Sequence, residues 1–347
     1  MVSPCLHRRA PGRASVRPGR DAGPLPQGPG RGHVPPSFRP GRGTGGRAYA
    51  APGARPMTEL LEIAAGDCTL TLAPEIGGAI ASWTRGDVSI LRPVQEDALA
   101  QKNARGLGCF PLFPFSGRVA GRRFPWRGMT HELPALLDGA AIHGAGWKEP
   151  WRVADADPDD AILVLDHIPG PLWPFSFRAE QNFELQPDRL ICDMEITNTH
   201  THAAPVAFGL HPYFPRTPGC TLQFQAGGVW RKRPGEAVPG ERTAVPAEWD
   251  HSTARAPVEG IDDCFVDWTR PVRLTWPEAK LALTITADPV FRHLVVYVPP
   301  GRDYFCVEPV SNMNDGLNRL DGKDHGFTVL ESGDTLRGRV TFTLETL

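Results

Sequence analysis

The chain has 347 residues, of which 41% are hydrophobic and 22% charged, with 37 glycines and 37 prolines. This composition is typical of a globular protein that buries a substantial core, and it excludes a fibrous or wholly disordered chain. No run approaches the roughly 18 apolar residues of a membrane span, and no signal-peptide core is visible. We therefore expect a soluble, cytoplasmic protein with no membrane partner.

Residues 1–56 differ from the rest of the chain. They contain 10 Arg, no Lys, one acidic residue, 11 Pro and 11 Gly. A segment with so little apolar surface cannot offset its chain entropy, so we expect it to be disordered. We interpret it as a non-functional extension, with Met57 as a candidate initiator. The alternatives are a transit peptide, whose amphipathic helix the prolines oppose, and a nucleic-acid arm.

The body, residues 57–347, has 27 Lys and Arg against 38 Asp and Glu, a net charge of −11. So acidic a body binds nucleic acid poorly, and we expect no nucleic-acid partner. The seven cysteines are odd in number and form no Cys-x-x-Cys pair, which indicates reduced thiols rather than a disulfide frame or a zinc site. They are Cys5, Cys68, Cys109, Cys192, Cys220, Cys264 and Cys306.

From residue 66 onward the dominant pattern is period-two alternation, interrupted by Gly, Pro and Asp, which is typical of half-buried strands. We predict strands over 68–72, 79–83, 88–91, 162–166, 177–185, 190–197, 206–210, 222–225, 272–276, 281–286, 293–298, 305–307 and 340–344. Helices are expected to be scarce because Pro and Gly leave few uninterrupted windows for them. The fold class is therefore all-β, a large antiparallel sandwich, with a barrel as the other possibility.

Three aromatic, proline-framed segments are predicted to be rigid loops at the edge of the sandwich: residues 110–115, 171–175 and 211–215. Aromatic faces stack on the C–H surfaces of sugars and polar side chains bind hydroxyl groups, so such loops favour a carbohydrate site. The polar groups that accompany them are Arg118, His143, His211, Asp262 and Glu308. Taken singly, each also fits a structural histidine, a turn cap or a solvated charge.

These residues fall in motifs whose order resembles the aldose 1-epimerases of the galactose mutarotase-like superfamily, over about residues 62–344. The motifs are Pro74-Glu-Ile-Gly-Gly-Ala-Ile80, Phe110-Pro-Leu-Phe-Pro-Phe-Ser-Gly-Arg118, His143-Gly, His211-Pro-Tyr-Phe, Asp262-Asp-Cys-Phe, Glu308-Pro-Val-Ser-Asn and Gly326-Phe-Thr-Val-Leu-Glu-Ser-Gly-Asp-Thr-Leu336.

The resemblance implies a large β-sandwich over 57–347 and an isomerase, a mutarotase that interconverts the α and β anomers of a free hexose. It implies His211 as general acid and Glu308 as general base, with Arg118, His143 and Asp262 as sugar-binding groups. No metal and no organic cofactor are expected. Two departures affect substrate preference: Gly117 stands where many relatives carry Asn, and Ala145 where some carry a second His.

Mutarotation opens a hemiacetal by taking the anomeric proton while protonating the ring oxygen, so one base and one acid suffice. Glu is ionised at neutral pH, whereas His must be kept protonated by neighbouring charge, for which we expect Asp262. Three alternatives stay open. One is a hexose-6-phosphate 1-epimerase, with Arg122, Arg123 and Arg178 as phosphate ligands. The second is a non-catalytic sugar-binding sandwich. The third is a metal-dependent β-barrel enzyme, but His200 and His202 are the closely spaced candidate metal ligands in the sequence, and no carboxylate accompanies them at ligand spacing. The oligomeric state is not indicated.

Overall fold

The alternating segments of the sequence form two large antiparallel sheets. The computed structural model describes residues 59–232, 236, 238–320 and 325–347, all within the compact unit Tyr49–Leu347. The predicted disordered extension, 1–56, lies outside the described residues, so its disorder and the domain start at 57 remain predictions.

The first sheet has 11 strands in the order β1-β2-β3-β5-β15-β23-β22-β19-β17-β18, with β4 paired to β3. Its strands are β1 (Leu61–Ala65), β2 (Cys68–Ala73), β3 (Ala79–Arg85), β4 (Val88–Ser89), β5 (Cys109–Leu112), β15 (Gly209–Pro215), β17 (Gly228–Lys232), β18 (Pro239–Thr243), β19 (Asp262–Val266), β22 (His293–Tyr297) and β23 (Tyr304–Val310).

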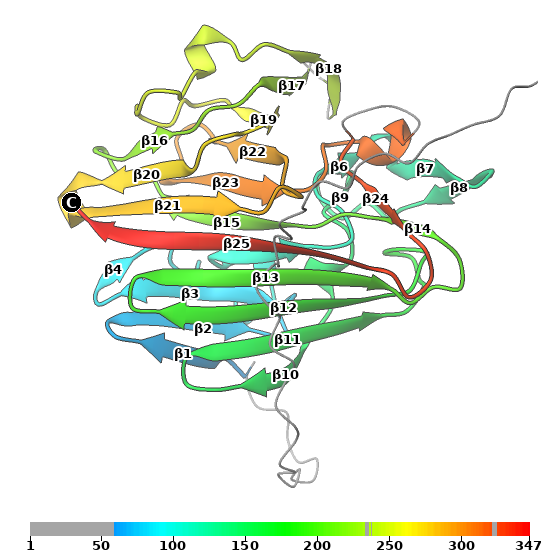
Figure 1. Cartoon of the computed structure of the whole chain (residues 1–347), viewed down its shortest axis with the longest axis horizontal. Coiled ribbons are helices and arrows are strands. Elements are labelled where there is room, and N and C mark those ends of the chain that lie inside the picture. The colour runs from blue at the N-terminus through cyan, green and yellow to red at the C-terminus, as the bar shows by residue number, and fades with distance from the viewer. Residues whose placement is uncertain (1–58, 233–235, 237, 321–324) are drawn as a thin grey trace, which may run out of the picture. The chain divides into compact units, whose positions relative to one another are not determined.

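The second sheet has eight strands in the order β10-β11-β12-β13-β25-β21-β20-β16, several of which run side by side in Figure 1. They are β10 (Arg152–Ala156), β11 (Asp160–His167), β12 (Phe177–Gln186), β13 (Arg189–Asn198), β16 (Thr221–Gln223), β20 (Val272–Trp276), β21 (Leu281–Ala287) and β25 (Thr335–Thr346).

Three short two-stranded sheets complete the strands: β6 (Arg118–Val119) with β9 (Ala141–Ile142), β7 (Arg123–Trp126) with β8 (Met129–Glu132), and β14 (Ala204–Val206) with β24 (Thr328–Leu330). All helices of the described residues are 3-10 turns: η1 (Ala104–Gly106), η2 (Ala120–Arg122), η3 (Gly146–Lys148), η4 (Ala247–Trp249), η5 (Pro277–Ala279) and η6 (Gly316–Arg319). The predicted all-β class and the predicted scarcity of helix are confirmed.

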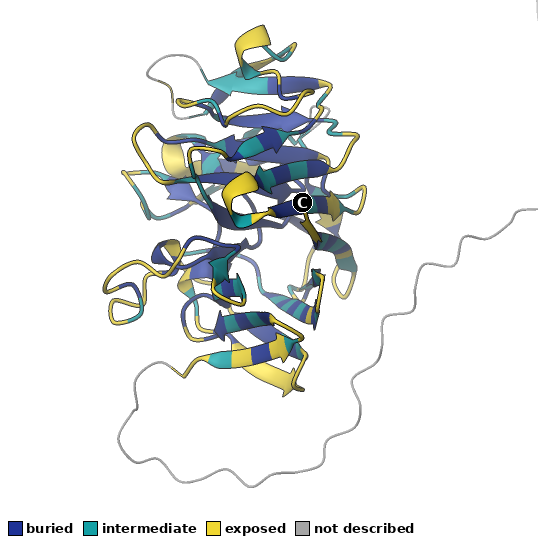
Figure 2. Cartoon of the chain, turned by 90° about the vertical axis from the view of Figure 1, so that its left-hand side faces the viewer, coloured by how far each residue is buried: buried dark blue, intermediate teal, exposed yellow. Residues whose placement is uncertain are grey.

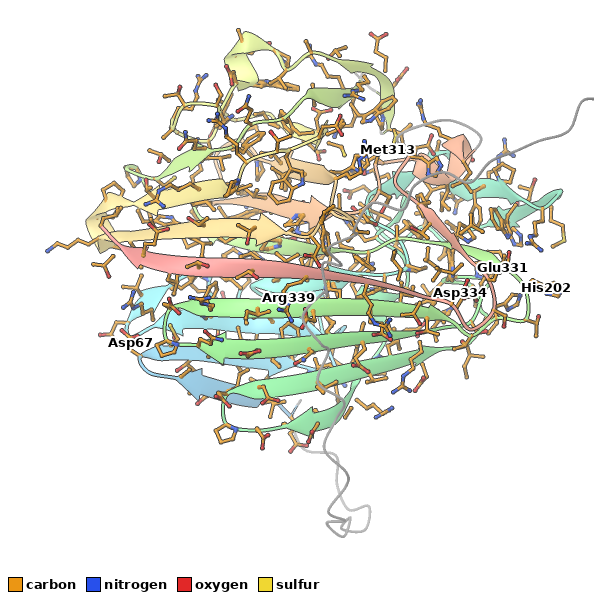
Figure 3. The ribbon with its side chains drawn as sticks, in the orientation of Figure 1. Asp67, His202, Met313, Glu331, Asp334 and Arg339 are labelled. Carbon is orange, nitrogen blue, oxygen red and sulfur yellow. The ribbon has the colours of Figure 1, made fainter. Side chains whose placement is uncertain are left out.

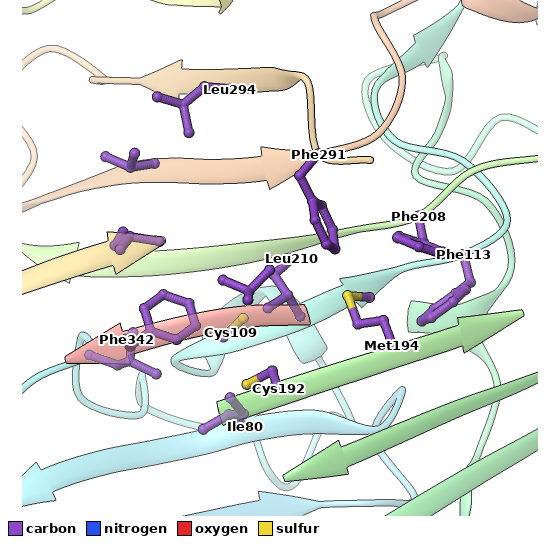
Figure 4. Close-up of a cluster of buried hydrophobic side chains, with 14 of the residues drawn as sticks. Ile80, Cys109, Phe113, Cys192, Met194, Phe208, Leu210, Phe291, Leu294 and Phe342 are labelled. Atoms are coloured by element: carbon purple, nitrogen blue, oxygen red, sulfur yellow. The ribbon is translucent and has the colours of Figure 1, made fainter. Parts of the chain in front are cut away.

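The core lies between the two sheets, and Figure 4 shows side chains from both meeting there. Leu210 comes from β15 in the first sheet, while Met194 and Phe342 come from β13 and β25 in the second; each is at most 3% exposed. Burial alternates residue by residue along β12 and β13, visible as banding in Figure 2. This alternation is the sandwich pattern that the sequence predicted.

The outer face of the second sheet is polar. Arg339 on β25, labelled in Figure 3, donates hydrogen bonds of 2.6 and 2.8 Å to the carboxylate of Asp193 on β13. Residue pairs of this kind leave that face solvated. The cavity that we describe below lies on the other large sheet.

Most predicted strands are present, but the segment around His211 differs from the prediction. The predicted strand 206–210 is divided between β14 and β15, and residues 211–215 are strand, not loop. Pro212 caused the error, since proline within a run argues against a central strand. The predicted loop 110–115 likewise begins as strand β5. The site is therefore built on the face of a sheet rather than on edge loops.

No helix within the described residues is both long and apolar enough to cross a membrane. The six cysteines in this part of the chain are free and buried.

Candidate active site

Two neighbouring strands of the first sheet bring His211 and Glu308 together. Strands β15 and β23 pair antiparallel, with Gly209 opposite Val310 and Tyr213 opposite Cys306. Midway between these pairs, the same register sets His211 opposite Glu308. Side chains directly opposite on one sheet face are in contact distance, and His211 Nε2 lies 3.3 Å from Glu308 Oε1. Residues 97 positions apart in sequence thus form a pair through sheet register alone.

Aromatic rings fix the orientation of His211. Phe110, opposite it on β5, stacks on the imidazole with ring centroids 4.5 Å apart, and Tyr213 stacks on it at 4.7 Å. The ring of His143 meets the imidazole edge-on at 5.3 Å. Arg92 lies beneath this stack, with its guanidinium 3.8 Å from the Tyr213 ring centroid. Because His211 is 7% exposed, it has little freedom to turn away from Glu308.

Arg118 and His143 are held beside the pair by a short hairpin. Strand β6 begins at Arg118 and pairs with β9, and His143 follows β9 directly. The Gly117 amide donates to His143 Nδ1 at 3.1 Å, and the His143 amide donates to the Gly117 carbonyl at 3.0 Å. His143 has φ +63°, a left-handed conformation that His adopts more readily than most side chains. The loop thereby fixes the imidazole rather than leaving it mobile.

The segment that follows Glu308 is hydrogen-bonded to the segment that carries Arg118. Asn312 exchanges two hydrogen bonds with the backbone of Ser116, both of 2.9 Å. Asn314 Oδ1 accepts from the Arg118 amide at 3.2 Å, and the Asp315 carboxylate accepts from the Ala120 amide at 2.9 Å. The loop that follows the strand carrying Glu308 therefore positions Arg118.

Asp262, at the start of β19, is half exposed and paired to two cations. Its carboxylate binds the Lys232 ammonium, and its Oδ2 lies 3.7 Å from Arg118 Nη1. The carboxylate thus anchors the Arg118 guanidinium at the edge of the site.

All five residues singled out in the sequence line one cavity of about 130 Å³. This is far above the roughly 10 to 15 Å³ that one water needs. Phe110 and Tyr213, from the aromatic segments predicted to accompany the site, also line it, whereas the sequence analysis missed the polar lining residues Arg105, Asp138, Tyr297 and Asn314. The run Ser311-Asn-Met-Asn-Asp315, which begins three residues beyond Glu308, was the available signal for Asn314, because adjacent buried amides and carboxylates need partners.

Burial shifts the pKa values of His211 and Glu308 in opposite directions. Burial, reinforced by the nearby Arg92, lowers the pKa of His211 to about 3. Burial, with a contribution from the charge of Asp262, raises the pKa of Glu308 well above its ordinary value. Both effects favour an uncharged imidazole beside a protonated carboxyl, that is, a pair that shares one proton.

This result corrects our expectation that Asp262 keeps His211 protonated. Asp262 is neutralised by Lys232 and Arg118, whereas the imidazole is deeply buried and faces Glu308. Desolvation disfavours the imidazolium, and the distant carboxylate does not compensate for it.

His143 is a neutral hydrogen-bond donor. Burial, with the nearby His211 and Arg118, lowers its pKa well below the ordinary value. Since its Nδ1 accepts the Gly117 amide, the proton of the neutral ring sits on Nε2. Such a nitrogen can donate to a sugar oxygen.

Gly117, the departure from the family pattern, has a structural cause. It has φ +78°, and a Cβ there would lie 1.6 Å from Asn314 Oδ1. Asn314 therefore occupies the space that a side chain at 117 would take, and presents an amide to the cavity instead. Ala145, the second departure, is fully buried in the turn before η3.

One cluster of possible metal ligands occurs among the described residues: His211, Cys306 and Glu308. His200 and His202, the closely spaced histidines of the sequence, lie in the loop between β13 and β14; His202 is labelled in Figure 3.

Residues 59–343 match the family model described as aldose 1-epimerase. The uncharacterized protein YphB of Escherichia coli strain K12 is 29% identical over 281 residues, covering 78% of this chain and 94% of that protein. A crystal structure of a candidate aldose 1-epimerase from Escherichia coli K12 is 27% identical, with a TM-score of 0.75 over 83% of this chain and 99% of its own. A galactose mutarotase-like protein from Clostridium acetobutylicum, 19% identical, shares the fold with a TM-score of 0.73 over 83% and 95%.

Proposed function

Because this chain belongs to the aldose 1-epimerase family, we propose that it is a mutarotase that interconverts the α and β anomers of a free hexose. His211 acts as general acid and Glu308 as general base, while Arg118, His143 and Asp262 bind the sugar. The functional domain comprises residues 57–347 and works in the cytoplasm, for which the free, buried thiols argue. It needs neither metal nor organic cofactor.

The reaction begins with movement of the shared proton. Transfer from Glu308 to His211 across the 3.3 Å gap gives a carboxylate and an imidazolium, and the charge of Arg118 favours the carboxylate. Glu308 then accepts the proton of the anomeric hydroxyl while His211 donates one to the ring oxygen, and the C1–O bond of the ring breaks. The aldehyde turns about its bond to C2, and the reverse transfers close the other anomer.

The observation that carries this proposal is the facing geometry of His211 and Glu308 at one cavity. The two oxygens that exchange protons sit on the same sugar carbon, so acid and base must lie close together. A pair fixed by cross-strand register meets this requirement without rearrangement. His143 and Arg118 add donors for ring hydroxyls on the adjoining wall.

The test is polarimetry of freshly dissolved α-glucose and α-galactose with His211→Ala, Glu308→Gln and the control His202→Ala. Each site variant should lose about 10² to 10⁴ in rate, whereas His202 lies outside the cavity and its variant should match wild type. Near wild-type turnover by a folded site variant would overturn that residue's role. Sugar binding without anomer exchange by the wild type would instead support a non-catalytic binding protein.

A second candidate is a hexose-6-phosphate 1-epimerase, and one observation favours it. Arg122, Arg123 and Arg178 do not line the cavity, and Arg178 pairs with Asp166. Arg105 does line it, and has no carboxylate partner among the described residues. A cation left unpaired at a sugar cavity suits an anionic substituent.

Saturation-transfer NMR with glucose and glucose 6-phosphate separates the two candidates. For the phosphate enzyme, anomer exchange should be faster with glucose 6-phosphate, and this preference should be lost in Arg105→Ala but kept in Arg122→Ala. Faster exchange with free glucose would exclude it.

A further inference from the structure

A third side chain with strong affinity for metals lies beside the proposed acid–base pair. Cys306 and Glu308 are two residues apart on β23, so both point to the cavity face of the sheet. Cys306 is opposite Tyr213, next to His211 along β15. One donor atom each of His211, Cys306 and Glu308 lies within 4.8 Å of the other two. Nitrogen, sulfur and oxygen donors thus converge from two strands.

The spacing suits a tetrahedral ion. Zinc binds imidazole nitrogen and carboxylate oxygen at about 2.0 to 2.2 Å, which sets such donors about 3.3 Å apart at tetrahedral angles. His211 Nε2 and Glu308 Oε1 are 3.3 Å apart. Zinc–sulfur bonds are about 2.3 Å long, so a tetrahedral ion sets the sulfur about 3.5 Å from the other donors. The Cys306 thiol lies within 4.8 Å of both, and rotation about its Cα–Cβ bond is the movement that brings it into range.

The donors are also available. Glu308 Oε2 is buried and has no hydrogen-bond partner among the described residues. Cys306 is fully buried, and no hydrogen bond of its thiol occurs within that same part of the chain. By contrast, the thiol of Cys264 on β19, separated from β23 by β22, contacts the Phe265 carbonyl at 3.8 Å. Among the described residues, therefore, the Cys306 thiol has no hydrogen-bond acceptor and the nearby Glu308 Oε2 has no hydrogen-bond donor.

We propose that His211, Cys306 and Glu308 form a site for a thiophilic divalent cation of the Zn²⁺ type, which inhibits the protein. The ion takes the thiolate, an imidazole nitrogen and a carboxylate oxygen, and the displaced protons leave to solvent. Its fourth position faces the cavity and holds water. An ion bound there removes both groups of the acid–base pair, so sugar and metal exclude one another.

The binding experiment uses the full chain and Co²⁺, whose thiolate complexes absorb in the near ultraviolet. We expect one Co²⁺ per chain with a sulfur-to-cobalt band, displaced by Zn²⁺, in wild type and in Cys264→Ser. Cys306→Ser, with Cys306→Ala as a second variant in case the serine protein does not fold, should lack the band. Even outer-shell partners are worth about 10- to 100-fold in metal affinity, so loss of a direct ligand should weaken Zn²⁺ binding by at least about 100-fold. A retained band in both variants, or no stoichiometric binding to wild type, would overturn the site.

Inhibition is measured separately, as the anomer-exchange rate against free Zn²⁺, each variant normalised to its own zinc-free rate. Wild type and Cys264→Ser should be inhibited and rescued by chelator, and the Cys306 variants should resist. Equal inhibition of all four proteins would refute inhibition through this site. The inhibitory role rests on the proposed mutarotase function, but the binding does not: a protein with the cobalt band and no exchange activity would refute the function and keep the site.

Discussion

The contact between Gly117 and Asn314 gives the sharpest prediction of stability, because the chain supplies a matched control. Gly117 and Gly128 both have φ +78°, but a Cβ at 128 meets nothing within 4 Å, whereas a Cβ at 117 lies 1.6 Å from Asn314 Oδ1. Gly128→Ala therefore measures the backbone cost alone, and Gly117→Ala measures the same cost together with the collision.

The magnitudes follow from the contacts. A left-handed alanine costs about 1 to 2 kcal/mol. To avoid the new Cβ, Asn314 must withdraw Oδ1 from the Arg118 amide, now at 3.2 Å. A buried amide left without its partner costs about 1 to 3 kcal/mol. Gly128→Ala should thus lower the free energy of unfolding by about 1 to 2 kcal/mol, and Gly117→Ala by about 2 to 5 kcal/mol.

Urea unfolding followed by circular dichroism measures both values, and Gly117→Ala combined with Asn314→Ala measures the coupling. The double variant should recover part of the loss, because the clashing oxygen is gone. Equal destabilisation by the two glycine variants, within about 0.5 kcal/mol, would refute the reasoning. The anomer-exchange assay should also show a higher KM for Gly117→Ala, since Arg118 loses its backbone anchor.

Three further predictions concern the histidines of the cavity, His211 and His143. The pH profile of kcat/KM should show no inflection near 6.5, the ordinary pKa of His, because burial holds the pKa of His211 at about 3; an inflection near 6.5 would contradict the shared-proton pair. The native state binds fewer protons at His211 than the unfolded chain does, so lowering the pH from about 6.5 towards 3 should destabilise wild type more than His211→Asn in urea titrations at each pH; parallel curves would refute the lowered pKa. His143→Ala should raise the KM for sugar about fivefold with a smaller change in kcat, as expected for one hydrogen bond of about 1 kcal/mol; an unchanged KM would argue against sugar binding by His143.

The sequence predicted most strands because their two faces differ. Met194 and its alternate neighbours on β13 are buried while the residues between them contact water, and this contrast is readable without coordinates. Pro212 was misleading because a proline in a central strand is rare. Nothing local in the sequence indicates that the register of β15 and β23 sets His211 opposite Glu308, since that pairing depends on residues far apart in the chain.

The same limit explains the residues that were missed. Arg105 lies in a short 3-10 turn and looks like any surface arginine until the fold places it at the cavity. Asn314 looks like a loop residue until its contact with the Gly117 position is seen. The protonation of His211 was misjudged because desolvation depends on packing, which the sequence does not contain.

The proposed acid–base pair and the proposed sugar-binding residues lie in different parts of the fold. His211 and Glu308 belong to neighbouring strands in the middle of a sheet, and a slip of one residue between them would turn one of the two into the apolar interior. The proposed sugar-binding residues lie instead at strand ends and in the adjoining loop: Arg118 begins β6, Asp262 begins β19 and His143 follows β9, and such positions tolerate exchange better than the middle of a sheet. Substitutions at these outer positions can therefore change which sugar is bound, whereas the proposed proton transfer requires that β15 and β23 keep their register.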